Sequence, residues 1–136
     1  MSHFYYLIKI LQKSSDGRYP LHIVVTSQCP QNLKQFLKSF DRSKINVKAD
    51  GQNNALHLLV NSLNQSNLTN VGECLKLLLL NGCNPNFSND DDKTPFFMLL
   101  EKQLMIPDAG NLVKFFIENA DIDVYTYQSD KFIEMF

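Results

Sequence analysis

The chain has 136 residues, with 13 Lys and Arg against 14 Asp and Glu, so its formal net charge is −1. This length suits one domain with a modest core, and a composition of 44% hydrophobic and 20% charged residues excludes a disordered tail. The near-neutral charge argues against nucleic acid as a partner, because phosphate binding needs a surplus of cationic side chains. No apolar run reaches the length of about 18 residues that a membrane-spanning helix needs.

The first residues, 1–13, mix polar and apolar side chains and lack the small-residue cleavage site of a signal peptide. Cys29, Cys74 and Cys83 have no metal-ligand spacing, so we expect them to be buried as small hydrophobic residues in a reducing compartment. We therefore expect a domain of the cytoplasm, the nucleus or both. It would have no membrane attachment, no metal and no cofactor.

In chain order, three segments each place a polar turn before a short apolar helix. They are residues 16–22, 52–57 and 92–97, and the apolar triplets Ile-Val-Val, Leu-Leu-Val and Met-Leu-Leu follow them. A second helix is predicted in each unit, at residues 33–37, 74–79 and 112–117. Apolar positions there fall three and four residues apart, which is the spacing of one buried helix face. Short turns follow at residues 45–46, 83–86 and 120–123.

This repeated unit resembles the ankyrin repeat, whose pattern runs G-x-T-P-L-H-x-A-A, then V-V-x-L-L-L, then G-A-D-V-N. The matching stretches are residues 17–22, 77–86 and 93–97, and the three units stay in register. The resemblance implies an all-α solenoid of stacked helix–turn–helix units, joined by short hairpin-like turns, in a single domain over 1–136. Its parts would be a capping helix at 1–13, repeats at about 14–46, 47–86 and 87–123, and a partial repeat or cap at 124–136.

The three units differ in the residue that caps the start of their first helix. Thr94 before Pro95 places a side-chain oxygen at the cap and a ring with fixed φ at the first helical position. Asn54 caps in the same way although Ala55 replaces the proline, whereas Tyr19 cannot, so the first unit is expected to have the weakest cap. Two further positions bear on the turns. Gly82 fits the left-handed residue that ends a helix, and Gln52 stands where the family has its turn glycine.

His22 and His57 recur at the same place in successive units, and Phe97 occupies that place in the third. In ankyrin-like repeats this histidine is structural, because its ring nitrogens hydrogen-bond the turn and the neighbouring repeat. We prefer that interpretation to metal binding, which needs three or four converging ligands. An enzyme that uses Cys29 or His57 is a remote alternative.

The core of such an array lies between its units. One repeat cannot bury its apolar face alone, so the helices of successive units must pack together. The side chains expected to line this core are Leu21, Phe36, Leu56, Leu78, Leu99 and Phe116. A monomer is the simplest expectation, but an apolar outer face at the last unit would favour self-association through the C-terminal end.

Two connections inside the units look long. Residues 61–70 are polar and rich in Asn and Ser, which predicts a mobile surface loop. Residues 102–110 include Leu104, Met105 and Ile106 before a proline, so this apolar cluster either packs back on the array or contacts a partner.

What the resemblance implies about function is protein binding without catalysis, through the hairpin tips and the inner-helix face that together form a concave surface. The tip positions are Asp16, Arg18, Lys48, Asp50, Gln52, Asn89, Asp90, Asp91 and Lys93. The inner-helix positions are Ser27, Gln28, Asn61, Glu101 and Lys102. Within these sets, the partner-binding residues we favour are Arg18, Asp50, Gln52, Asn61, Asn89, Asp90, Asp91, Lys93 and Glu101. Phe87 joins them as a candidate aromatic anchor.

The acidic triplet Asp90, Asp91 and Asp92 lacks the glycine and glutamate spacing of a calcium loop. It is either a solvated turn or an acidic finger that faces a partner. Two narrower functions also stay open. The chain could be a small stand-alone inhibitor resembling the inhibitor-of-NF-kappa-B group, or a structural spacer that positions other domains of a larger protein.

Overall fold

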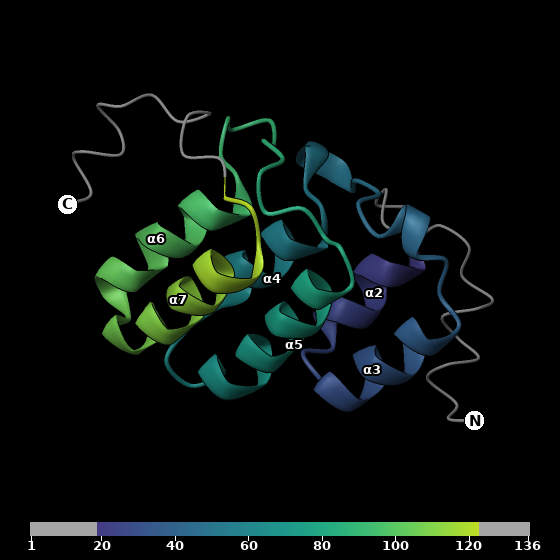
Figure 1. Ribbon diagram of the computed structural model, residues 1–136, viewed down its shortest axis with the longest axis horizontal. Helices are drawn as coiled ribbons and strands as arrows, with labels where there is room; N and C mark the ends of the chain where they lie inside the picture. The colour runs from purple at the N-terminus through teal and green to yellow at the C-terminus, as the bar shows by residue number, and fades with distance from the viewer. Residues whose placement is uncertain (1–18, 123–136) are drawn as a thin grey trace.

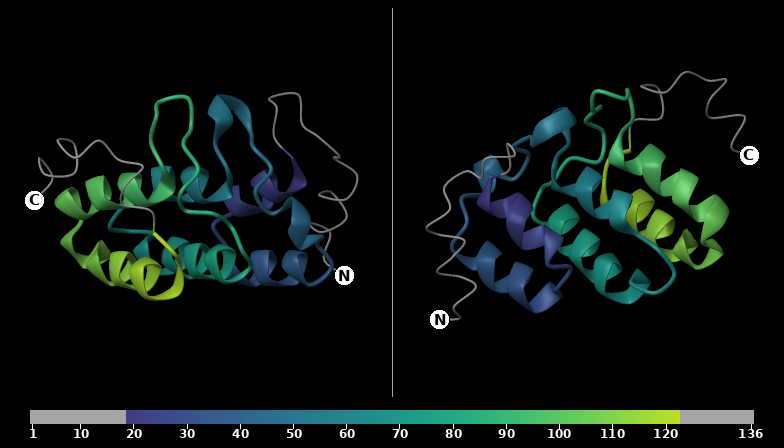
Figure 2. Two further views of the ribbon diagram at one scale, coloured as in Figure 1. Left: turned by 45° about the horizontal axis from the view of Figure 1, so that its top comes forward. Right: turned by 180° about the vertical axis from the view of Figure 1, so that it is seen from behind.

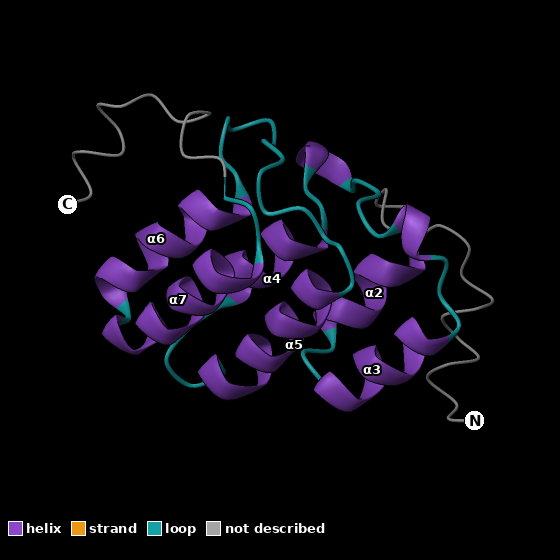
Figure 3. Cartoon of the chain, in the orientation of Figure 1, coloured by secondary structure: helices purple, strands orange, loops and turns teal. Residues whose placement is uncertain are grey.

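The computed structural model describes residues 19–122. The expected capping helix at 1–13, the partial unit at 124–136 and Arg18 lie outside the described residues. Between residues 19 and 122 the chain is helical and forms no β-strand, and an isolated β-bridge joins Ala49 to Asn53 (Figures 1 and 3). The all-α expectation is therefore confirmed for this part of the chain. No helix within it is long and apolar enough to span a bilayer.

The described residues form six α-helices and three short 3₁₀ helices. The α-helices are α2 (Pro20–Thr26), α3 (Pro30–Lys38), α4 (Ala55–Ser62), α5 (Leu68–Leu80), α6 (Pro95–Met105) and α7 (Gly110–Asn119). The 3₁₀ helices are η1 (Arg42–Lys44), η2 (Asp50–Gln52) and η3 (Pro107–Ala109).

The α-helices lie in two layers (Figure 2). In one layer α4 packs between α2 and α6, and in the other α5 packs between α3 and α7. Each helix of the first layer also packs against the next helix along the chain, which belongs to the second layer. The chain thus builds three successive helix pairs that stand side by side.

Local sequence explains where these helices begin and end. The side chains of Asn54 and Thr94 accept hydrogen bonds from the backbone N–H groups of His57 and Phe97, both at 3.1 Å, and so cap α4 and α6. Gly82, with φ of +93°, ends α5 in the left-handed conformation that glycine adopts without strain. These three termini follow the sequence-based expectation.

The core lies between the two layers and runs through all three helix pairs. All six residues expected to line it are buried there, with exposed fractions of 9% for Phe36 and 0% for the other five. Burial of one leucine side chain contributes about 2 kcal/mol, so a continuous core of this kind supplies the main driving force for folding. No single helix pair could bury these side chains by itself.

Both predictions of a long loop were wrong. Residues 61 and 62 belong to α4 and residues 68–70 to α5, which leaves a connection of residues 63–67. Leu63 anchors this connection in the core with 1% of its surface exposed. In the second case, α6 continues to Met105 and η3 leads directly into α7, so Ile106 is buried while Leu104 and Met105 are exposed.

Leu63→Ala is expected to lower the free energy of unfolding by about 2 to 4 kcal/mol, because it leaves a cavity in the core. Leu104→Ala is the matched control, since the same atoms are removed from a side chain that is 65% exposed. The control should change stability by less than about 0.5 kcal/mol. Urea denaturation of the two variants measures the difference, and equal losses would contradict the anchoring role of Leu63.

Candidate binding surface

The imidazole of His57 joins the start of α4 to the turn that precedes α6. Its Nδ1 accepts a hydrogen bond from the Asn54 N–H at 3.0 Å, and its Nε2 lies 2.9 Å from the carbonyl oxygen of Lys93. The ring is fully buried, and this burial lowers the pKa of His57 below its ordinary value of 6.5. A neutral ring therefore bridges one helix pair to the next.

His22 repeats this arrangement one unit earlier. Its Nδ1 accepts from the Tyr19 N–H at 3.1 Å, and its Nε2 lies 2.9 Å from the carbonyl oxygen of Val47. In the third unit Phe97 occupies the same place, and its ring is buried without the nitrogens that would make such a bridge. The histidine bridges thus join the first unit to the second and the second to the third.

Asparagines form a second set of bridges between units. The Asn46 side chain donates to the carbonyl oxygen of Gly82 at 3.2 Å and accepts from the Asn84 N–H at 2.6 Å. At the equivalent place in the next unit, Asn86 donates to the carbonyl oxygen of Asp121 at 2.7 Å. These bonds hold each turn against its successor, because the amide both donates and accepts.

Two turns, formed by residues 49–53 and 89–93, project side by side from the layer of α2, α4 and α6 (Figure 2). A backbone bond of 2.8 Å from the Asp90 N–H to the Gly51 carbonyl oxygen joins their tips. The two turns therefore form one continuous edge of the molecule.

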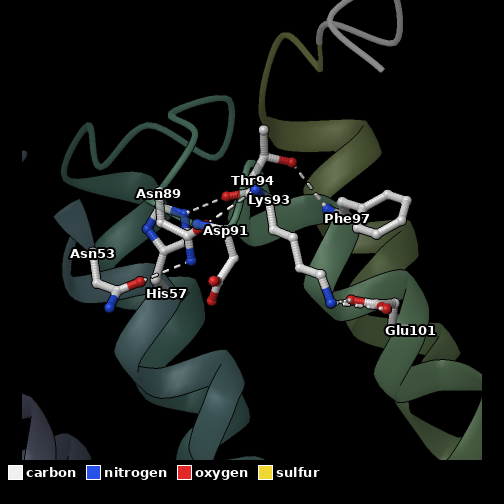
Figure 4. Close-up of polar contacts among 8 residues, drawn as sticks. All are labelled: Asn53, His57, Asn89, Asp91, Lys93, Thr94, Phe97 and Glu101. Atoms are coloured by element: carbon white, nitrogen blue, oxygen red, sulfur yellow. Dashed lines mark hydrogen bonds and ion pairs between the residues drawn. The ribbon is translucent and has the colours of Figure 1, made fainter. Parts of the chain in front are cut away.

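Asn89 closes the 89–93 turn from within. Its Oδ1 accepts from the N–H groups of Asp91 and Lys93, both at 3.0 Å, and its Nδ2 donates to Oδ1 of Asn53 at 2.9 Å (Figure 4). The polar atoms of this side chain are occupied inside the chain. Asn89 accordingly positions the surface and offers a partner little hydrogen-bonding capacity of its own.

Both turns place an ordinary residue in the left-handed region. Gln52 has φ of +60° and Asp92 has φ of +59°, beside Gly51 at +77°. This conformation is strained for most residues that carry a Cβ and is natural for glycine. Gln52 thus adopts the geometry of the glycine it was expected to replace, and Asp92 does so in the next turn.

Helix α6 presents a stripe of two methionine and two charged side chains beside the 89–93 turn. Met98, Glu101, Lys102 and Met105 follow the spacing i, i+3, i+4, i+7, which places them on one side of a helix. Met105 is 83% exposed, whereas Met98 is half-buried against the core. The stripe borders a shallow depression of about 270 Å³. The depression is lined by Asn61 of α4, by Asn89, Asp91 and Lys93 of the turn, and by Met98, Glu101, Lys102 and Met105 of α6.

Both lysines around this depression have hydrogen-bond partners within the chain. The Lys93 ammonium lies 3.0 and 3.2 Å from the two carboxylate oxygens of Glu101 (Figure 4). Lys102 donates to the carbonyl oxygens of Asn61 and Leu63 at 3.0 and 2.9 Å, which satisfies the C-terminal end of α4. Among residues 19–122, the exposed carboxylate of Asp91 has no hydrogen-bond or ion-pair partner.

Five of the ten favoured partner-binding residues lie together around the depression. Those around the depression are Asn61, Asn89, Asp91, Lys93 and Glu101. Those exposed on the tips of the two turns are Asp50, Gln52 and Asp90. Sequence reasoning missed Met98, and it took Met105 for part of a loop. The i, i+3, i+4, i+7 spacing from residue 98 was the available signal.

Phe87 lies at the base of the second turn and is half-buried. The Lys48 ammonium stands 5.0 Å from the centre of its ring, in a cation–π arrangement. One face of the ring is therefore already covered by this chain. A partner that used Phe87 as an anchor would have to displace Lys48 or approach the ring from another side.

The cysteines divide into two environments. Cys74 and Cys83 are buried, and burial raises the pKa of each thiol to about 12, so both stay protonated at neutral pH. Cys29 is only partly buried, which corrects the expectation that all three are core residues. In the described part of the chain, no group of three or more His, Cys, Asp or Glu side chains could hold a metal ion.

Asp92→Gly is expected to raise the free energy of unfolding by about 0.5 to 1 kcal/mol, because glycine relieves the left-handed strain. Asp91→Gly is the control, since Asp91 is exposed next to it and is not among the residues with positive φ. The control should lower stability by about 0.5 kcal/mol through its greater unfolded-state entropy. A stabilisation by both variants in urea denaturation would show that charge removal, and not φ, is responsible.

Because the folded-state pKa of His57 lies below the unfolded value, the unfolded chain binds a proton first as the pH falls. The stability that the neutral ring contributes is complete above about pH 6.5 and declines below it. We expect the wild type to lose more stability than His57→Gln between about pH 7 and about pH 5. Denaturation curves of both proteins measure this; identical pH dependence would contradict the buried neutral ring.

Comparisons with known proteins give a distant result. No protein-family model and no solved structure matches the chain. Over 125 residues the chain is 27% identical to the transient receptor potential cation channel protein painless of Drosophila melanogaster. The alignment covers 91% of this chain and 13% of painless. The chain is thus similar, along most of its length, to one short segment of a much longer protein.

Proposed function

We propose that this chain is an ankyrin-like protein-interaction module without catalytic activity. Its binding surface would consist of the 49–53 and 89–93 turns and the adjoining face of α4 and α6. The observation that carries the proposal is the depression beside the second turn, where five of the favoured residues meet around two methionines. Exposed methionine beside charged groups is typical of surfaces that adapt to a protein partner.

The internal order of the chain supports this proposal. Turns and helices recur in the sequence order of the ankyrin pattern, and equivalent histidines and asparagines bridge successive units. The two turns are held by the His57–Lys93 bridge, by the Asn89–Asn53 bond and by the backbone bond from Asp90 to Gly51, so a partner would meet a surface that is already organised. Such preorganisation lowers the entropy lost on binding. The segment shared with painless coincides with nearly the whole of the proposed module.

The proposal is tested by capture of proteins from a cell lysate on three immobilised proteins, followed by mass spectrometry. They are the wild type, the double variant Asp90→Lys/Asp91→Lys, and the control Glu73→Lys/Glu118→Lys. The control makes the same change of charge on α5 and α7, where each glutamate is exposed and forms only a surface ion pair. Circular dichroism and urea denaturation first establish that both variants are folded.

We expect a protein that the wild type and the control retain and that the double variant loses, by about tenfold or more in recovered amount. Retention by the double variant and loss by the control would move the interface to the outer helices and contradict the proposed surface. If no protein is retained by the wild type, the module is better explained as a spacer between other domains.

A further inference from the structure

We propose that the depression beside the 89–93 turn receives a basic side chain, above all arginine, from an extended segment of the partner protein. This inference rests on the proposed function and adds the chemistry of the partner. In the predicted complex, the guanidinium would pair with the Asp91 carboxylate. Its aliphatic stem would lie on the thioethers of Met98 and Met105.

The acidic component of the depression is available. In the view of Figure 4 the Asp91 side chain extends from the turn between the side chains of His57 and Lys93. It has no partner among the described residues, and the exposed Asp90 and Asp92 flank it in the chain. A carboxylate with free lone pairs at the rim of a depression is suited to a planar cation that donates several hydrogen bonds.

The cations in the same depression do not compete for Asp91. Lys93 is held by both oxygens of Glu101, and the ammonium of Lys102 is held by two carbonyl oxygens at the end of α4. The Lys93–Glu101 ion pair cancels its own charge, and the charge of Lys102 is held at the end of α4, so the three aspartates dominate the charge at the turn itself. An anionic side chain would instead be repelled there.

The two methionines form the apolar part of the lining of the depression, and their unbranched side chains can adapt to a ligand. Met105, at the end of α6, is 83% exposed. Met98, near the start of α6 and closer to the turn, is half-buried. Arginine is more weakly hydrated than lysine and its stem covers apolar surface, so this combination of thioethers and carboxylate favours it. An acidic turn without an apolar surface below it would not discriminate in this way.

Nuclear magnetic resonance signals of the methionine methyl groups report directly on binding in the depression. The protein is labelled with ¹³C at its methionine methyl groups, and the signals of Met98 and Met105 are assigned with Met98→Leu and Met105→Leu. Three blocked pentapeptides are titrated in, with sequence Gly-Ala-X-Ala-Gly and with arginine, citrulline or glutamate as X. Citrulline has nearly the shape of arginine without its charge.

We expect the arginine peptide to shift both methyl signals saturably, and citrulline to bind about fivefold more weakly, the factor that one exposed ion pair provides. Asp91→Asn should reduce arginine binding to the citrulline level. Glu73→Gln, which removes one negative charge from the exposed face of α5 away from the depression, should leave it unchanged.

Equal binding of arginine and citrulline, a preference for glutamate, or no saturable shift would each overturn the inference. So would an Asp91→Asn variant that binds arginine as well as the wild type does. The proposed function is decided by a different experiment: it is contradicted when capture of proteins from the lysate does not depend on Asp90 and Asp91. A partner lost by that double variant, together with no arginine preference, would retain the binding surface and reject only the basic side chain.

Discussion

The described structure depends on one buried polar contact, the imidazole of His57 between the Asn54 N–H and the Lys93 carbonyl oxygen. A helix start and a neighbouring turn would otherwise each contain an unsatisfied backbone group in the interior, which costs about 1 to 3 kcal/mol. Because the ring reaches across 36 residues of sequence, it fixes the place of the second turn relative to α4. The Asp91 carboxylate and the Lys93 ammonium take their positions from that turn.

Further contacts hold the turns of the candidate surface in place. Asn89 closes the turn internally, and a backbone bond from Asp90 joins it to the preceding turn. Polar groups that would be free in an isolated turn are therefore occupied here. The groups around the depression that a partner can reach include the Asp91 carboxylate, the Lys93–Glu101 ion pair and the side chains of Met98 and Met105. This division between groups that hold the surface and groups left for a partner is the basis of both proposals.

The sequence predicts the parts that depend on local chemistry. Caps at Asn54 and Thr94, the end of α5 at Gly82 and the buried apolar positions follow from residue type and helical spacing. The loops were misjudged because residues 63–67 look polar, whereas Leu63 is held by long-range burial that no local pattern reveals. The depression could not be predicted either. It lies between α6 and the 89–93 turn, and His57 of α4 holds that turn in place. Only the fold brings Asp91 and Met105 to the same depression.

A measurement of which ring nitrogen of His57 carries the proton tests the central contact most directly. If Nδ1 accepts from Asn54, the proton of the neutral ring must lie on Nε2 and be donated to the Lys93 carbonyl oxygen. Two-dimensional ¹H–¹⁵N spectra of the imidazole nitrogens report this state. We expect the neutral Nε2–H tautomer at neutral pH, retained below about pH 6.5 where a free histidine becomes charged. A ring protonated on Nδ1, or one that titrates like a free histidine, would contradict the account.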